Sequence, residues 1–182
     1  MLHQLAMSIG AGSGVGGNNK LYVDEVFSAY LYTGNGSTQT ITNGIDLAGK
    51  GGLVWLKRRE STSIHGLFDT SRGVGSTGLD TTSTGGAGYS GVTAFTGAGF
   101  TQNSTWNVSS GSYASWTFRN APKFFTHTQV TKSSGSNATV DLSTLGTVGM
   151  VAVKRTDSTG DWFVWHRSLT AGKLLYLNQA AE

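Results

Sequence analysis

The chain has 182 residues, of which 27 are glycine, one is proline and none is cysteine. Charged residues make up 13% of it, about half of the roughly 25% usual in soluble domains, and the net charge is +3. These totals exclude a disulfide framework and a thiolate metal site, and they predict no nucleic-acid partner. No apolar run approaches the roughly 20 residues of a membrane helix, so no membrane insertion is expected.

The first twenty residues predict an anchoring arm and linker. The first seven form a short apolar peptide without the basic start and long apolar core of a signal peptide. Residues 8–19 are rich in Gly, Ser and Asn and cannot bury enough apolar area to fold alone. Residues 12–17 fit the letters G-x-G-x-x-G, but the strand and helix that a dinucleotide site needs are missing around them. We expect Leu2, Leu5 and Met7 to anchor an extended arm on a partner.

From residue 21 onward, short apolar runs alternate with glycine-rich turns, as in all-β proteins. Residues 53–56 (Leu-Val-Trp-Leu) follow two glycines and lead into three basic residues, which predicts a strand buried on both faces. Further strands are expected at residues 26–32, 38–41, 67–70, 92–95, 99–101, 113–119, 161–166 and 174–178. Residues 73–91 predict a long exposed loop. The predicted fold class is all-β, with antiparallel jelly-roll or β-sandwich modules and a short extended N-terminal arm.

Two of these strands are predicted to differ in the faces that they bury. In residues 113–119 the residues Ala114, Trp116 and Phe118 alternate with more polar ones, which gives one apolar face. In residues 161–166 both faces carry aromatic side chains. This second strand is therefore expected to lie between layers or against a partner.

An internal repeat divides the chain. The stretch around Gly52 recurs 97 positions later (149 − 52) at Gly149, and the same offset relates the two Lys-Arg pairs that follow. The expected parts are the arm and linker at 1–20, a first sandwich module at 21–125, and a second, truncated copy at 126–182. A sandwich that stops there lacks its closing strands. We favour truncation of a longer protein; the alternative is a single sandwich in which the two copies share strands.

Four blocks, in order, resemble a known family. They are Tyr22–Ser28, Tyr32–Arg59, Leu67–Gly73 and Trp116–Phe125, and they are similar to virion proteins of phages that infect marine and freshwater bacteria. The resemblance implies concanavalin- or laminin-G-like sandwich modules on a phage particle, with other virion proteins as partners. It brings no catalytic motif. The second copy departs from the pattern at residues 131–134, so the two units need not bind alike.

Catalytic and metal-ligating patterns are sparse. His65 and Asp69 are four residues apart, but a zinc site needs three or four ligands, and Asp80 has no companion acids for calcium. The sequence contains no G-x-S-x-G motif, and no pair of carboxylates can be singled out for glycan hydrolysis. We therefore predict no enzyme activity, no metal and no cofactor.

Trp106 is the candidate for ligand binding. Its neighbours include the polar Asn103 and Asn107, whereas Trp55 and Trp116 lie in apolar runs and are expected in the core. An exposed tryptophan with amide partners could stack on a sugar ring or pack on a neighbouring subunit. The alternative is a loop tryptophan folded back over the edge of the sandwich.

These features predict a structural protein located in the virion, with a tail-fibre or receptor-binding component as the leading interpretation. Its N-terminus would attach to the particle, and its modules would bind a host-surface glycan. A homo-oligomer, with a trimer favoured, would cover the open sheet edges. Two alternatives remain open: a head decoration or cement protein that clamps capsid subunits, and a surface protein that binds or hydrolyses carbohydrate.

Overall fold

The computed structural model describes residues 2–7, 20–133, 135 and 137–179, and for residues 3–7 it describes the backbone alone. The strands form antiparallel sheets of five, six and three strands. Helical structure in the described residues is limited to α1 (Val23–Val26), α2 (Leu47–Lys50) and two short 3-10 turns at Ser104–Trp106 and Ser143–Leu145. The prediction of an all-β, antiparallel sandwich is confirmed.

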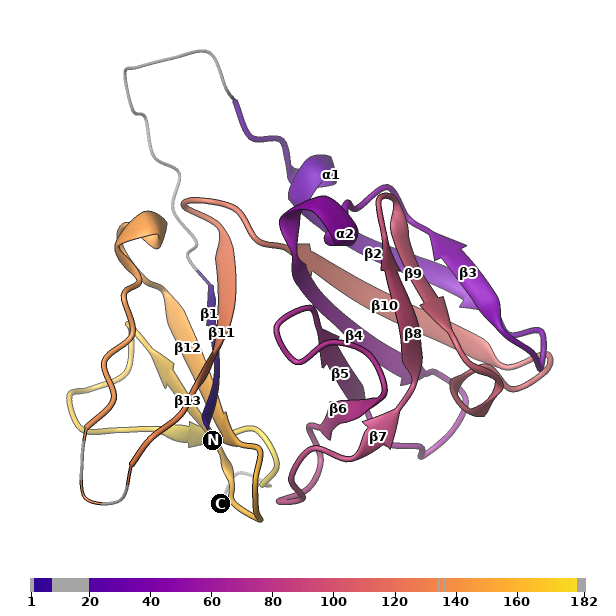
Figure 1. The fold of residues 1–182 in the computed structure, drawn as a ribbon. Helices are drawn as coiled ribbons and strands as arrows, with labels where there is room; N and C mark the ends of the chain where they lie inside the picture. Colours follow the sequence, from indigo (N-terminus) through magenta and orange to yellow (C-terminus); the bar gives the residue numbers. More distant parts are fainter. Residues whose placement is uncertain (1, 8–19, 134, 136, 180–182) are drawn as a thin grey trace.

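The first repeat unit supplies two of the sheets. The six-stranded sheet consists, in spatial order, of β2 (Phe27–Thr33), β10 (Ser112–Arg119), β4 (Gly52–Arg58), β5 (Gly66–Asp69), β6 (Ser76–Asp80) and β7 (Tyr89–Ser90). The three-stranded sheet consists of β3 (Gln39–Thr42), β9 (Gly99–Gln102) and β8 (Val92–Thr96). It lies against one face of the six-stranded sheet (Figure 1).

The second repeat unit forms the five-stranded sheet together with the N-terminus. Its spatial order is β11 (Phe125–Val130), β1 (Leu2–Met7), β12 (Met150–Arg155), β13 (Trp162–His166) and β14 (Leu175–Tyr176). The sequence predicted a separate arm over residues 1–20, and that part of the prediction is corrected for Leu2–Met7. These residues lie inside a sheet because β11 and β12 leave one strand position open between them, and β1 pairs antiparallel with both.

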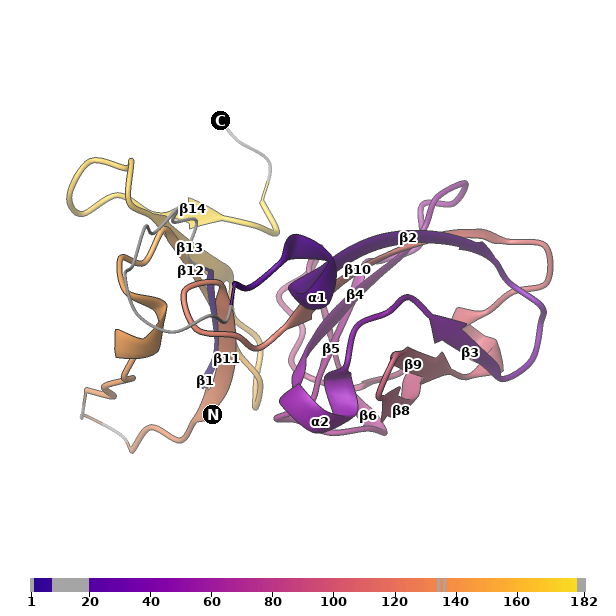
Figure 2. The same cartoon turned by 90° about the horizontal axis from the view of Figure 1, so that it is seen from above.

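The six-stranded sheet is the middle of three layers, with a hydrophobic core on each face. Figure 2 shows the five-stranded sheet next to the part of it that β4, β5 and β6 form. The core toward the three-stranded sheet contains Ile41, Ile45, Leu47, Val54, Leu56, Phe68, Val92 and Phe100. The core toward the five-stranded sheet contains Leu53, Leu67, Leu79, Phe125, Ala152, Trp162 and Val164. β4 contributes Val54 and Leu56 to the first core and Leu53 to the second, so the prediction that it is buried on both faces is confirmed.

The more polar face of β10 is buried, although its sequence suggested one apolar face. Ser115 and Thr117 are fully buried, and the Asn43 side-chain amide donates to the Thr117 hydroxyl over 2.8 Å. The reason is the three-stranded sheet, which covers that face. In β13 the alternation places Trp162 in the core and leaves Trp165 40% exposed. Among the residues that the structure describes, β13 is therefore packed on one face only.

The predicted loop at residues 73–91 contains β6 and β7, and Leu79 within it is fully buried. Gly78 allows this packing, because a Cβ at that position would overlap the Phe68 ring. Residues rich in Gly, Ser and Thr resemble a loop by composition, and tertiary packing overrides that preference here. The strand predicted at 174–178 is reduced to the two residues of β14.

The two units share one strand order: β2-β10-β4-β5-β6 in the first and β11-β1-β12-β13-β14 in the second. Ser115 of β10 lies opposite Leu56, and Gln4 of β1 lies opposite Val153. Leu56 and Val153 are 97 positions apart, which is the offset of the sequence repeat. β1 thus occupies in the second sheet the position that β10 holds in the first.

Candidate functional site

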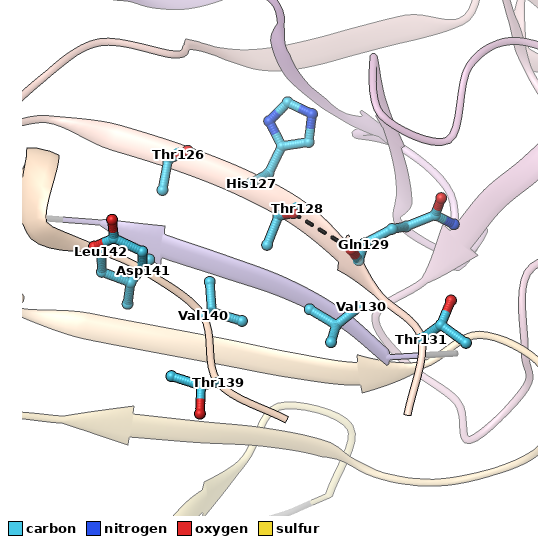
Figure 3. A pocket seen from close by; sticks show the side chains of 10 residues that line it. All are labelled: Thr126, His127, Thr128, Gln129, Val130, Thr131, Thr139, Val140, Asp141 and Leu142. Atoms are coloured by element: carbon cyan, nitrogen blue, oxygen red, sulfur yellow. Dashed lines mark hydrogen bonds between the residues drawn. The ribbon is translucent and has the colours of Figure 1, made fainter. Parts of the chain in front are cut away.

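Two hollows in the described surface could accept a ligand. The larger, of about 500 Å³, runs between β11 and residues 139–142. Figure 3 shows that Thr126, Thr128 and Val130 point toward that segment, whereas His127 points to the opposite side of the strand. Hydroxyl and aliphatic groups line most of this hollow, together with His127, Gln129 and Asp141, and it is wide open to solvent.

The smaller hollow, of about 250 Å³, lies on the first unit. It is lined by Arg58, Ser63, Ile64, Tyr89, Thr105, Trp106, Val108 and Tyr113. Three of these side chains are aromatic, and ligand sites are typically apolar and aromatic with a few polar groups that fix orientation. We therefore take this aromatic hollow as the candidate site, and it includes the tryptophan that the sequence singled out.

A 3-10 turn at Ser104–Trp106 positions the indole. The Asn103 side-chain oxygen accepts a hydrogen bond from the Trp106 backbone N–H over 3.2 Å, which caps this turn. The Asn103 amide nitrogen donates to the Ser90 carbonyl over 3.0 Å. Asn103 therefore ties the Trp106 turn to β7.

The Trp106 ring is folded back over the edge of the sandwich. It packs edge-on against Phe68, with ring centroids 5.4 Å apart, and against Tyr89 at 6.4 Å. Two glycines leave room for it: a Cβ at Gly66 would lie 2.5 Å from Trp106 Cη2, and one at Gly91 would lie 3.0 Å from Cδ1. The indole is half-buried and still lines the hollow. Its binding of a ligand stays a prediction.

Asn107 is fully buried, and its side chain holds the turn at residues 35–37. Its amide nitrogen donates to the Asn35 side-chain oxygen over 2.7 Å and to the Ser37 carbonyl over 2.6 Å. Asn103 and Asn107 are both absent from the lining of the aromatic hollow. In this structure the two amides position the loops around Trp106, and the proposed ligand contact of either remains a prediction.

The polar rim of the hollow is built around Arg58. Its Nε donates to Glu60 Oε1 over 2.7 Å, and the other oxygen of Glu60 accepts from the Ser112 backbone N–H over 2.9 Å. The hydrogen bond from Arg58 lowers the pKa of Glu60 and keeps it ionised. The Tyr113 hydroxyl accepts from the Val108 backbone N–H over 3.0 Å. With one guanidinium, hydroxyls and aromatic rings, this site is equipped to bind.

Sequence reasoning missed Arg58, Tyr89 and Tyr113 as neighbours of Trp106. They come from β4, β7 and β10, and strand pairing alone brings them together. Only Tyr89 could have been noticed from the sequence, because it is an aromatic residue in a stretch otherwise rich in Gly, Ser and Thr.

Each of the candidate metal ligands has other partners. His65 Nδ1 accepts from the Trp55 indole N–H over 3.0 Å, and burial lowers the pKa of His65. Asp80 accepts from the Thr82 backbone N–H over 2.8 Å, and Asp69 forms a buried ion pair with Arg72. In the part of the chain that the structure describes, no group of three or more His, Cys, Asp or Glu side chains is placed to hold a metal ion.

The residues predicted to anchor the arm lie in the five-stranded sheet. The backbone of Leu2 is opposite Val130 and Arg155, and Leu5 and Met7 continue the same two ladders. Leu2 is partly buried. Their anchoring role on a separate partner remains a prediction.

A family model, described as "Domain of unknown function (DUF7483)", matches residues 23–140. The chain belongs to this family. No curated protein and no solved structure matches the chain. The region matched by the family includes all residues that line the aromatic hollow, and β12 and β13 lie beyond it. Among the described residues, no helix is long and apolar enough to cross a membrane.

Proposed function

We propose that this chain is a structural component of a bacteriophage virion, of the tail-fibre or receptor-binding type, and that it acts by binding rather than by catalysis. The observation that carries the proposal is the aromatic hollow at Trp106, which sits on a sandwich with buried cores on both sides of its middle sheet. The four sequence blocks that resemble virion proteins support the assignment to a particle.

A sugar ring of a host-surface glycan is the ligand that this hollow suits best. The apolar C–H face of a pyranose packs well on aromatic rings, and Trp106 and Tyr89 provide such surfaces. Arg58 and Ser63 at the rim offer hydrogen bonds to hydroxyl or carboxylate groups of the sugar. The volume of about 250 Å³ suits one ring, because sites for larger molecules start at roughly 300 Å³.

Exposed apolar side chains on the second unit support a homo-oligomer, for which a trimer is our expectation. Phe163 and Trp165 of β13 are 41% and 40% exposed, and Leu175 and Tyr176 of β14 are 52% and 43% exposed. The Phe163 and Tyr176 rings lie 5.4 Å apart, and Trp165 is on the same face of β13 as Phe163, whereas Leu175 lies opposite Val164 and faces the other side. Apolar clusters of this kind on a surface indicate contacts with other proteins.

A glycan array probed with the labelled full chain tests the recognition step. We expect binding to a bacterial surface glycan that falls at least tenfold in Trp106→Ala and in Val108→Arg. Val108 is 41% exposed, so an arginine there would fill the hollow with little effect on the core. The control Trp165→Ala removes an exposed tryptophan outside the hollow and should bind normally. Binding that both hollow variants retain would contradict the proposal, and release of free sugar would contradict its non-catalytic part.

The location on the particle is tested with virions purified from an infected culture of the host bacterium. Mass spectrometry should detect the chain, and immunogold labelling should mark the tail. Gold over the head would instead support a decoration or cement protein. Absence of the chain from purified particles would overturn the virion assignment.

A further inference from the structure

β11 and β12 are separated by a single strand position, and β1 fills it. β1 has six register pairs with β11 and six with β12, so its two edges are both used. Adjacent strands in a sheet are about 4.8 Å apart, which places β11 and β12 roughly 10 Å from each other. Without β1 each of these strands would present an unpaired edge to the gap. We call this gap the strand slot.

The first wall of the strand slot, β11, is fixed by contacts that do not involve β1. Phe125 is buried in the core shared with the six-stranded sheet. His127 Nε2 accepts from the Ser71 backbone N–H over 3.2 Å, and its Nδ1 lies 2.9 Å from the Asn120 side-chain oxygen. β11 is thus held to the first unit by side chains on its inward face.

The second wall, β12, is also fixed to the first unit. Ala152 is buried in the shared core. The fully buried Lys154 donates from Nζ to the Thr84 carbonyl over 3.1 Å, and the Ala87 backbone N–H donates to the Thr156 carbonyl over 3.1 Å. Both walls of the slot are therefore fixed to the first unit by contacts that do not involve β1.

The occupant is tied to the fold in a different way from its neighbours. Twelve residues, 8–19, connect it to the first unit, and five of them are glycine. Twelve residues can reach at most about 40 Å when fully extended. The ladders on either side of β1 consist of main-chain hydrogen bonds, and such bonds do not distinguish a strand of the same chain from that of another copy.

We propose that the strand slot is a strand-acceptor site and that its partner in assemblies is Leu2–Met7 of a second copy of this chain. The chain itself shows that this segment fits the slot in register with both walls. Reciprocal exchange would give a closed dimer, and head-to-tail exchange would give a ring or a fibre. The proposal is independent of glycan binding and of the virion assignment.

Disulfide trapping between two different chains tests the exchange. One chain carries only Gln4→Cys and the other only Val153→Cys, and the protein has no cysteine of its own. These positions are opposite each other in the β1–β12 ladder, as are Leu5 and Ala152, which provide a second cysteine pair. Neighbouring pairs alternate between hydrogen-bonded and non-hydrogen-bonded geometry, so the two choices sample both. The control replaces Val153→Cys with Ser158→Cys, which is exposed and outside β12.

The chains are mixed in mild denaturant, refolded over a range of protein concentrations and oxidised. We expect a disulfide-linked heterodimer from Gln4→Cys with Val153→Cys, at least fivefold above the Ser158→Cys control and increasing with protein concentration. The increase is expected because exchange joins two chains and depends on their concentration, whereas insertion of a chain's own strand does not.

A single chain with both Gln4→Cys and Val153→Cys provides the second measurement. If it forms only an intramolecular disulfide at every concentration, and the mixed chains do not exceed the control, exchange between copies is overturned. If neither cysteine pair closes, within one chain or between chains, the placement of β1 in the strand slot is itself wrong.

Discussion

β10 and β1 occupy equivalent positions in two sheets of the same strand order, but they are held differently. β10 is covered on both faces: Thr117 is buried under the three-stranded sheet, and Phe118 packs against the core shared with the second unit. β1 is in a sheet whose outer face leaves Phe163 and Trp165 exposed. The two units therefore share a position for this strand in the sheet. The sequence of the strand and the residues that surround it differ between the units.

A second difference between the units concerns the aromatic hollow. Gly66 makes room for the Trp106 ring in the first unit, and the residue 97 positions later is Phe163. The register agrees, since Gly66 lies opposite Leu56 and Phe163 lies opposite Val153. A large side chain thus replaces the glycine on which the hollow depends, so the two units cannot bind the same ligand in the same way.

Trp162→Ala should have the largest effect on stability. It tests whether the second unit packs on the first unit as a layer of the same fold. Trp162 is fully buried in the shared core, and its indole N–H donates to the Asp80 carbonyl over 2.8 Å. We expect a loss of about 3–5 kcal/mol in the free energy of unfolding, measured by urea denaturation. Trp165→Ala, on the exposed face of the same strand, should cost less than about 1 kcal/mol. Equal effects would mean that β13 does not pack as described.

Asp69→Asn should rank next, because it breaks a buried ion pair of the first unit whose acidic residue has no acidic counterpart in the repeat. Asp69 and Arg72 are both buried, and the residue corresponding to Asp69 in the repeat is His166. Removal of one partner of a buried pair leaves an uncompensated charge, so we expect a loss of about 3 kcal/mol in urea denaturation.

The exposed pair Arg155–Asp157 provides the matched control for the buried one. Its Nε–Oδ1 distance is 2.8 Å, and the corresponding pair Arg58–Glu60 in the first unit has a distance of 2.7 Å. We expect Asp157→Asn to leave the unfolding midpoint unchanged, because solvent screens exposed pairs. A loss as large as that of Asp69→Asn would contradict the assigned burial.

Gly66→Ala should have a smaller effect that is specific to the hollow of the first unit. The added Cβ would lie 2.5 Å from Trp106 Cη2 and must displace the indole. Overpacking of this kind costs about 1–3 kcal/mol, and we expect altered tryptophan fluorescence together with weaker glycan binding. Gly88→Ala is the control, because a Cβ there meets nothing within 4 Å. Unchanged fluorescence in Gly66→Ala would place Trp106 elsewhere.

His65→Gln should produce the smallest effect, in the pH dependence of stability. Burial, followed by the nearby Lys57, lowers the pKa of His65 in the folded chain. The unfolded chain binds a proton at His65 below about pH 6.5, before the folded chain does. The neutral imidazole therefore stabilises the folded chain above this pH, and this stabilisation is lost as the pH falls through the lower pKa of the folded chain. The glutamine variant should lose slightly less stability between about pH 7.5 and 5.5, by a few tenths of a kcal/mol because His65 is partly exposed. A larger pH-dependent loss in the variant would reverse the sign of this argument.

Local pattern was sufficient to predict some elements and insufficient for others. The run Leu53–Leu56 predicted a strand buried on both faces because its apolar residues do not alternate. The Lys-Arg pair that follows this run recurs 97 positions later at the end of β12. The position of β1 could not be predicted, because it depends on an unfilled gap between strands distant in sequence. The buried hydroxyls of β10 were also missed, because their cover is supplied by β3, β8 and β9.

The candidate site was predicted in part. Trp106 was identified from its polar neighbours, but Asn103 and Asn107 proved to hold loops through their amides. The hollow itself depends on Gly66 and Tyr89, which strand pairing brings to Trp106 from different segments. Amino-acid composition does not predict which distant residues strand pairing brings together.

The central claim, that β1 completes the second sheet as β10 completes the first, is tested most directly by hydrogen–deuterium exchange of the full chain and of Gln4→Pro. A proline in a central strand removes a ladder donor and is not tolerated there. We predict slow exchange in Leu2–Met7 of the unmodified chain and, in the variant, loss of protection in β11 and β12 with β10 unchanged. Rapid exchange in Leu2–Met7, with β11 and β12 equally protected in both proteins, would contradict the claim.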